Sequence, residues 1–426
     1  MQDGRLSKRV QMEGRNKTHS LVTGNITWGM LWFAVPMILG NLLQQFYNIA
    51  DTLIVGRFLG AKALAAVGSA YTLMIFLTSV LLGLCMGSGV VFSLQYGARD
   101  HEALKRSIFV SLVLIGVITL LLNIAVFVWI DPILRLLQVP AEVYILMRDY
   151  LWIIFGGIGF TFLYNYYASL LRAVGNSVLP LVFLAVAVVL NIVLDLVFIL
   201  YFGWGVRGAA LATVKEIATY SSLTCAQQSV MNFGILMVQG LINSFGTAVM
   251  AGFAAAVKID SFAYMPVQDF GNAFSTFIAQ NFGAGKHERI RKGIRVAVRV
   301  TLIFCLIISV LVFVLARPLM LIFIPAHETE IISIGVEYLR IEGAFYCGIG
   351  WLFLLYGFYR AVRRPGMSVV LTVISLGVRV ALAYTLAAIP GIGVWGIWWS
   401  IPIGWFLADI FGWCYYRMKQ RKSLEW

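Results

Sequence analysis

The sequence predicts an all-α integral membrane protein made of two parallel six-helix bundles. Hydrophobic residues make up 61% of the 426-residue chain and charged residues only 12%, and the mean hydropathy is +0.88. A soluble domain carries about 25% charged residues, whereas apolar runs of about 20 residues can cross a bilayer as helices. The apolar runs of this chain do not alternate with period two, so a transmembrane β-barrel is not indicated.

An internal repeat divides the chain into two halves. Residues 96–102 (YGARDHE) return 186 positions later as 282–288 (FGAGKHE), and 203–208 (GWGVRG) return 188 positions later as 391–396 (GIGVWG). A register kept between such distant landmarks indicates two copies of one architecture, related by a pseudo-two-fold axis along the membrane normal. In an apolar chain, paired halves are typical of transporters, whose central site opens alternately to each side.

Eleven apolar segments are long enough to be membrane spans. They cover residues 28–56, 66–94, 107–130, 148–171, 178–202, 223–246, 251–282, 296–316, 338–359, 368–390 and 394–416. Basic residues gather in both tails and in alternate loops, above all in 98–107 and 283–299. Because Lys and Arg accumulate on the cytoplasmic side of membranes, both termini are expected to be cytoplasmic.

The first half has too little chain for its sixth span. After Gly208 the apolar stretch 209–214 is followed at once by Lys215, where the second repeat begins, and about six residues cannot cross a bilayer. Eleven spans would also place the basic loops of the second half outside. We therefore expect twelve transmembrane helices, with helix six truncated in this sequence: about 20–30 residues of this helix and its linker are missing. The expected divisions are a cytoplasmic tail (1–27), an N-terminal lobe (28–214), a C-terminal lobe (215–416) and a second tail (417–426).

Several other classes of protein are not supported by the sequence. The five cysteines are scattered singly through apolar segments, so neither a disulfide framework nor a metal site is expected. The net charge of +13 lies in short loops, where it sets topology, and does not indicate a nucleic-acid partner. Neither a Walker A motif nor a nucleophile–base set is found, so we expect no enzyme, no ATP use and no cofactor.

Apart from Asp149 at the very start of its span, two acidic residues lie inside spans of the first half, where a charge at mid-bilayer costs about 2.5–3.5 kcal/mol. Gln44, Tyr47 and Asp51 are spaced i, i+3, i+7 on one helix face, and Asn191 and Asp195 are spaced i, i+4 on another. Burial favours the protonated form of a carboxyl group, and wetting or an arriving cation reverses this preference. These faces predict a site for a coupling ion. For either aspartate the alternatives are a structural hydrogen bond or a place near a helix end that is exposed to water.

Pro36 lies in the first span, about four helical turns before Asp51. Because proline removes one backbone hydrogen bond of a helix, this span is expected to bend at Pro36.

The second half does not repeat the two aspartates. The repeat shifts place Met237 opposite Asp51 and Ala383 opposite Asp195, so ion handling is expected in the first half alone. The polar residues of spans seven and eight are instead Gln227, Gln228, Asn232, Gln239, Lys258, Asp260 and Asp269. We expect Lys258 and Asp260 to form an ion pair near the outer surface, with a cavity-lining role as the alternative.

These features resemble those of the MATE (multidrug and toxic compound extrusion) family, over residues from about 25 to 416. The resemblance rests on Pro36, the tract 48–52 (NIADT), the pair Asn191 and Asp195, and the loop motifs 96–98 (YGA) and 282–285 (FGAG). The chain is similar to the DinF-like branch, in which aspartates of spans one and five form a cation site in the N-terminal lobe. This implies Tyr47, Asn165, Asn191 and Thr213 as polar partners of the ion site. Residues 225–232 contain no acid, unlike span seven of the NorM-like branch.

The resemblance implies a secondary active antiporter that exports organic, often cationic, compounds in exchange for protons or sodium ions, by alternating access between two lobes. A proton entering down 100 mV supplies about 2.3 kcal/mol. Small organic substrates and the bacterial inner membrane are the expected partners, and a monomer is expected. Candidate substrate-binding residues are Gln44, Asn165, Gln228, Asn232, Gln239 and Asp269. A flippase for a lipid-linked saccharide, from the same superfamily, is the alternative; the buried aspartates and the scarcity of buried bases count against it.

Overall fold

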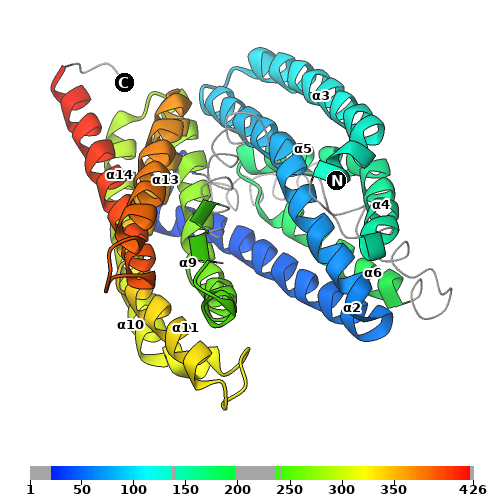
Figure 1. The fold of residues 1–426 in the computed structure, drawn as a ribbon. Coiled ribbons are helices and arrows are strands. Elements are labelled where there is room, and N and C mark those ends of the chain that lie inside the picture. The colour runs from blue at the N-terminus through cyan, green and yellow to red at the C-terminus, as the bar shows by residue number, and fades with distance from the viewer. Residues whose placement is uncertain (1–20, 137–140, 197–236, 239–240, 243, 423–426) are drawn as a thin grey trace, which may run out of the picture. The chain divides into compact units, whose positions relative to one another are not determined.

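The computed structural model describes residues 21–136, 141–196, 237–238, 241–242 and 244–422, which form helices joined by short connections (Figure 1). The helices are α2 (Ile26–Gly97), α3 (His101–Leu136), α4 (Ala141–Gly156), α5 (Ile158–Ala173), α6 (Val178–Leu196), α9 (Thr247–Gly283), α10 (His287–Met320), α11 (Thr329–Ala344), α12 (Tyr346–Ala361), α13 (Pro365–Ala387) and α14 (Val394–Lys422). The expected shortfall of helix six, near 209–214, lies outside the described residues.

Helix α2 contains both of the first two expected spans, 28–56 and 66–94, in one helical segment of 72 residues. A straight helix of that length would measure about 108 Å, several times the hydrocarbon thickness of a bilayer. Accordingly, the α2 ribbon in Figure 1 runs out in dark blue and returns in lighter blue. The loop expected between the two spans was wrong, because residues 57–65 stay helical. These residues are mostly good helix formers, with Gly60 as the exception.

Two of the expected spans are broken helix pairs that occupy the same place in the two halves. Helices α4 and α5 are bent by 49°, and α11 and α12 by 54°. At the first break the N–H of Gly157 donates to the carbonyl of Ile154 (3.0 Å), and at the second the N–H of Phe345 donates to that of Glu342 (2.9 Å). These three-residue turns tighten the helix end. The break is therefore part of the repeated architecture.

The repeat is also visible in the backbone angles of the loops. Arg99 (φ 59°) and Gly285 (φ 68°) occupy equivalent positions of the two halves, and so do Gly175 (φ 93°) and Arg363 (φ 60°). In all four cases the following residue donates its N–H to the carbonyl five positions before it, over 2.9–3.1 Å. This left-handed helix ending favours glycine, because a side chain there costs about 1–2 kcal/mol. Each pair uses glycine in one half and arginine in the other.

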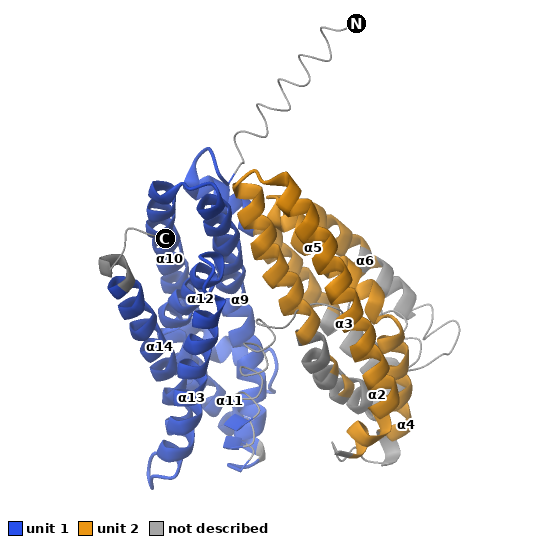
Figure 2. Ribbon diagram, turned by 90° about the horizontal axis from the view of Figure 1, so that it is seen from above, with its two compact units in different colours: residues 1–34, 227–426 blue, residues 35–226 orange. Residues whose placement is uncertain are grey.

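The described chain forms two compact units. Unit 1 comprises residues 1–34 and 227–426, and unit 2 comprises residues 35–226 (Figure 2). In unit 1, α9 packs against α10, α11 and α12, and α13 packs against α14; in unit 2, α3 packs against α4 and α5. The first helix thus contributes its opening residues to the second-half unit, and the division falls between Ala34 and Val35, one residue before Pro36.

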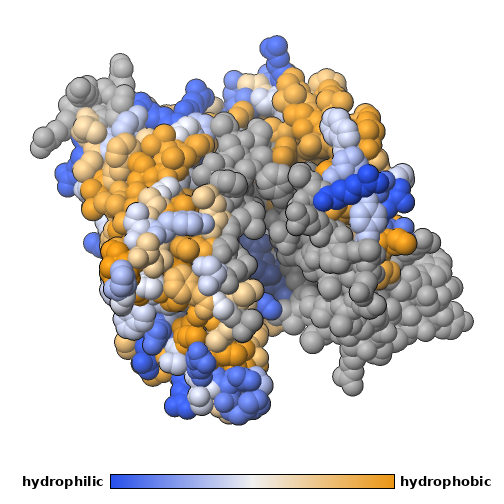
Figure 3. Space-filling model, in the orientation of Figure 1, coloured by the Kyte–Doolittle hydropathy of each residue, from blue (hydrophilic) through white to orange (hydrophobic). Residues whose placement is uncertain are grey.

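Much of the surface is suited to lipid. Within the described residues, seven helices and two bent helix pairs are long and apolar enough to cross a membrane. Hydrophobic residues, orange in Figure 3, cover broad areas of the side in view. On α3 the exposed side chains include Phe109, Leu121 and Val128, and on α10 they include Ile303 and Val314. Apolar surface of this extent is covered by a bilayer or a partner.

Candidate functional site

Tyr47 links the first span to the fifth. Its side chain is 1% exposed and belongs to a buried cluster with Leu184 and Val188 of α6, bordered by Leu43 and Tyr164. The face of α2 that was expected to carry the ion site therefore packs against α6, the helix that carries the second expected aspartate.

The face of α6 that contacts Tyr47 also carries the predicted polar pair Asn191 and Asp195. Leu184, Val188, Asn191 and Asp195 are spaced by four, three and four residues, and therefore lie along one side of the helix. The side chains of Asp51, Asn191 and Asp195 lie outside the described part of the structure, although all three residues belong to helices. Their grouping stays a prediction, supported by the Tyr47 contact.

The other predicted site residues have different placements. Asn165 on α5 is 5% exposed, and its side-chain nitrogen donates to the carbonyl of Thr161 over 3.0 Å. Gln44 is half-buried and Pro36 is buried within α2. Asp269 lies inside unit 1 on α9 with 2% exposure. Thr213, Gln228, Asn232 and Gln239 lie outside the described residues.

A buried acidic cluster lies in unit 1. The hydroxyl of Tyr346 on α12 donates to Oδ1 of Asp260 on α9 over 2.7 Å. The side chains of Glu342 and Tyr338 on α11 also act on Asp260, and the charge of Arg379 on α13 acts on both carboxyl groups. Asp260 is 5% exposed and Glu342 is 1% exposed. Two acids thus lie in the electrostatic field of one guanidinium, so a single proton would balance the charge of the three groups.

The expected ion pair between Lys258 and Asp260 was wrong. Lys258 is exposed whereas Asp260 is buried, because residues two apart point to nearly opposite sides of a helix. The cationic neighbour of Asp260 is Arg379, from a distant helix. Sequence reasoning overlooked Glu342 and Arg379. Both are charged residues inside expected spans, which is the signal that would have found them.

The opening of the first helix is anchored to the second half. Residues 21–24 present backbone carbonyls to three polar side chains at the junction of α9 and α10. Arg289 donates to the carbonyls of residues 24 and 23 (2.9 Å each) and 21 (3.3 Å), Lys286 donates to residue 22 (2.9 Å), and Asn281 to residue 21 (3.0 Å). The guanidinium of Arg289 also lies 5.7 Å from the ring centre of Phe277. The start of α2 is thereby fixed to unit 1.

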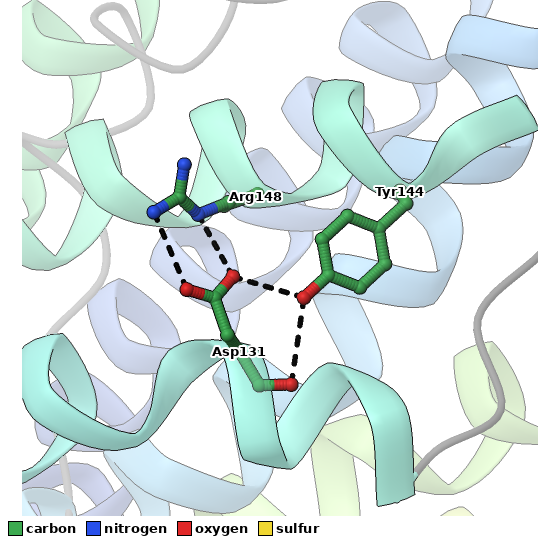
Figure 4. A network of polar contacts seen from close by, with 3 residues as sticks. All are labelled: Asp131, Tyr144 and Arg148. Carbon is green, nitrogen blue, oxygen red and sulfur yellow. Dashed lines mark hydrogen bonds and ion pairs between the residues drawn. The ribbon is translucent and has the colours of Figure 1, made fainter. Parts of the chain in front are cut away.

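Unit 2 has a polar network of its own at one end of α3 and α4 (Figure 4). Nε and Nη2 of Arg148 lie 2.9 Å and 3.3 Å from the two carboxylate oxygens of Asp131, and the Tyr144 hydroxyl donates to Oδ1 of Asp131 over 2.9 Å. The paired side chains are 43% and 39% exposed. A two-point contact of this kind fixes the geometry of two helices, and we assign it a structural role.

Comparison with known proteins agrees with this architecture. The MatE family model matches residues 36–197 and again residues 223–385, once in each half of the internal repeat. A Bacillus subtilis relative named "Probable multidrug resistance protein YpnP" is 30% identical over 444 residues, which cover 96% of this chain and 99% of the relative. That aligned length exceeds the 426 residues of this chain, so the relative contains residues without a counterpart here.

Solved structures show the same fold. A MOP superfamily transporter from Pyrococcus furiosus superposes with a TM-score of 0.87 at 21% identity, and the match covers 95% of this chain and 98% of that one. An outward-facing multidrug resistance MATE family transporter gives a TM-score of 0.86 with the same identity and coverage. The expected all-helical membrane fold is confirmed, and so is the expectation of a transporter and not an enzyme. Both copies of the family pattern span most of the chain, and this protein therefore belongs to the MATE family of multi-pass membrane transporters.

Proposed function

We propose that this protein exports organic, often cationic, compounds across the bacterial cell membrane by secondary active antiport with protons or sodium ions. Membership of the MATE family supports transport. The names of its relative YpnP and of the matching outward-facing structure refer to multidrug resistance, which supports a broad range of small substrates.

The contact of Tyr47 with α6 is the observation that carries the proposed ion site. Spans one and five are both odd-numbered, so they cross the membrane in the same direction. One turn beyond Tyr47 lies Asp51, and one to two turns beyond Val188 lie Asn191 and Asp195. Starting from a shared contact, the polar residues of both helices thus reach the same depth. We assign the two aspartates as ion-coupling groups, and Tyr47, Asn191 and Thr213 as their partners.

Pro36 is the proposed bending point of the first span. The division between the two compact units falls one residue before Pro36, and the chain at the start of the helix is held by Arg289 and its neighbours. A helix that lacks one backbone bond bends at low cost. Ion loading between α2 and α6 would change the packing of the section beyond Pro36, while the anchored section stays in place.

The branch, orientation and substrate residues are also part of the proposal. The absence of an acid from residues 225–232 favours the DinF-like branch. The exposed basic side chains after α2 and along the start of α10 favour a cytoplasmic position for these loops and both termini. Substrate is proposed to meet the polar residues Gln44, Asn165, Gln228, Asn232, Gln239 and Asp269.

Reconstitution tests the proposed function. The purified full chain in liposomes should expel a fluorescent organic cation when an inward proton or sodium gradient is imposed. Asp51→Asn and Asp195→Asn should each abolish gradient-driven transport while leaving the protein folded. Met237→Asn, at the repeat position of Asp51, is the matched control and should retain transport. Wild-type rates in both aspartate variants would overturn the ion-site assignment.

A failure of the wild-type protein to respond to either gradient would overturn antiport. Movement of a labelled lipid-linked saccharide between leaflets under the same conditions would then favour the flippase alternative.

A further inference from the structure

Three arginines form a row on the surface of α10. Arg291, Arg295 and Arg299 are all exposed and are spaced i, i+4, i+8, so they occupy one side of the helix over about 12 Å. We call this row the arginine stripe.

The same side of α10 continues as an apolar surface. Beyond Arg299, in steps of three or four residues, come Ile303, Ile307, Val310 and Val314, which are between 55% and 66% exposed. Residues 300–316 contain no charge and span about 26 Å of helix, close to the hydrocarbon thickness. The arginine stripe therefore begins where a lipid-facing surface ends, at the depth of the phospholipid headgroups.

The equivalent helix of the first half lacks this stripe. At the repeat shift of 186, Arg291 corresponds to Lys105 of α3, but Arg295 and Arg299 correspond to Phe109 and Val113. These two apolar side chains are 68% and 50% exposed. The architecture thus accepts apolar residues at both lipid-facing positions, and the second half places guanidinium groups there instead. A charge at such a position requires a compensating partner.

The acid closest to the stripe along the sequence of α10 is Glu288, and it does not neutralise the stripe. Glu288 is engaged by Lys292, whose Nζ lies 2.6 Å from its carboxylate, and the hydrogen bond and charge of Lys292 lower the pKa of Glu288. The field of Arg291 acts on Tyr416 together with that of Arg417 from α14, which adds a further positive charge at this end. Neither of these described groups supplies the stripe with a negative charge, which leaves an anion outside the described residues as its partner.

We propose that the arginine stripe binds the phosphate groups of anionic phospholipids in the leaflet at this end of α10. Guanidinium groups bind phosphate oxygens in a two-point geometry, and basic residues at an anionic membrane surface each strengthen binding. Because α10 packs against α9, α11 and α12, bound lipid would hold the outer face of unit 1.

The test measures how anionic lipid stabilises the full-length protein. Nanodiscs of phosphatidylcholine are compared with nanodiscs that contain increasing fractions of phosphatidylglycerol, and the thermal unfolding midpoint is followed. In the wild type the midpoint should rise with phosphatidylglycerol. Arg295→Gln and Arg299→Gln should each raise the lipid fraction needed for half of this rise by about fivefold, and the double variant should lose the response.

Matched variants separate this site from a general effect of charge. Lys105→Gln with Arg106→Gln removes two exposed charges from α3 and should leave the response intact. Should the double glutamine variant fail to fold, the single Arg299→Gln variant still gives the fivefold shift. The proposal is overturned by a wild-type response in the Arg299→Gln variant, or by equal loss in the α3 control. It is also overturned if inorganic phosphate alone stabilises the detergent-solubilised protein as phosphatidylglycerol does, which would indicate a free-anion site.

Discussion

The bent pair α4–α5 of the first half can be compared directly with α11–α12 of the second half. The bends are 49° and 54°, and the same three-residue backbone turn forms each break. The carbonyl that accepts the turn's hydrogen bond belongs to Ile154 in the first half and to Glu342 in the second. The backbone is repeated, while a buried apolar side chain is exchanged for a buried acid.

Other positions also carry a charge in only one of the two halves. Positions of the acidic cluster, Asp260, Glu342 and Arg379, correspond to Met74, Ile154 and Asn191. The aspartates proposed for ion coupling correspond to Met237 and Ala383. Turn geometry and helix packing restrict the backbone of both halves alike. Each buried charge is placed individually, because its cost must be met by particular partners. A charged residue whose repeat position in the other half is uncharged therefore marks a place where the two halves differ in role.

Breaking the acidic cluster should give the largest effect on stability. Arg379→Met would leave Asp260 and Glu342 buried without their cation, and we expect a loss of about 3–5 kcal/mol. Ile154→Val, at the first-half position of Glu342, should cost about 0.5–1.5 kcal/mol. Unfolding of the purified protein in detergent would compare the two. Equal losses in the free energy of unfolding would show that the two buried acids do not depend on Arg379.

The contacts of residues 21–24 with Asn281, Lys286 and Arg289 form what we call the N-terminal anchor. Releasing this anchor should have the second-largest effect. Arg289→Gln removes the charge-assisted hydrogen bonds from the guanidinium to residues 21–24, and we expect their loss to total about 1.5–3 kcal/mol. A cysteine at Leu21, which is 3% exposed, should then react about 10- to 150-fold faster with a thiol reagent. The exposed Cys414 is replaced by serine beforehand to remove its background.

Arg291→Gln, which removes an exposed charge two residues further along α10, is the control for the anchor. It should leave labelling of the cysteine at position 21 unchanged. Fast labelling in the otherwise wild-type protein would contradict the anchored state.

A helix crossing offers a third comparison. In the first half the Ser169 hydroxyl donates to the carbonyl of Cys85 over 2.7 Å. The repeat positions are Gly357 and Gly271, and a Cβ added at Gly357 would lie 2.5 Å from the Gly271 carbonyl oxygen. Gly357→Ala should therefore destabilise by about 1–3 kcal/mol through overpacking. Ser169→Ala should cost about 0.5–1.5 kcal/mol through its lost hydrogen bond. The reverse order of melting temperatures would refute this reading of the crossing.

The ion pair of Asp131 and Arg148 should matter least. Both side chains are more than a third exposed, so solvent screens their attraction, and Arg148→Met should cost about 0.2–1 kcal/mol. The difference between variant and wild type should shrink further at high salt. A loss of several kcal/mol that is insensitive to salt would show that the pair is shielded from solvent.

The sequence predicted those features that rest on local patterns. Apolar length located the spans, and Gly285 with its neighbours revealed the repeat that the backbone angles later showed. The continuous helix across residues 57–65 was missed because a turn between spans need not interrupt helical hydrogen bonding. The partners of Asp260 were missed because they come from three other helices, and helical spacing describes only neighbours on one helix.

Substrate binding at equilibrium tests most directly whether ion coupling belongs to the first half. By linkage, ion and substrate must weaken each other's binding by the same factor. Affinity for an organic cation is measured across pH and sodium concentration in the wild type, Asp195→Asn and Asp260→Asn. We predict that affinity falls as pH drops or as sodium rises in the wild type and in Asp260→Asn, and that it becomes insensitive to both in Asp195→Asn. Dependence that survives Asp195→Asn and disappears in a folded Asp260→Asn variant would contradict this assignment and place the coupling in the second half.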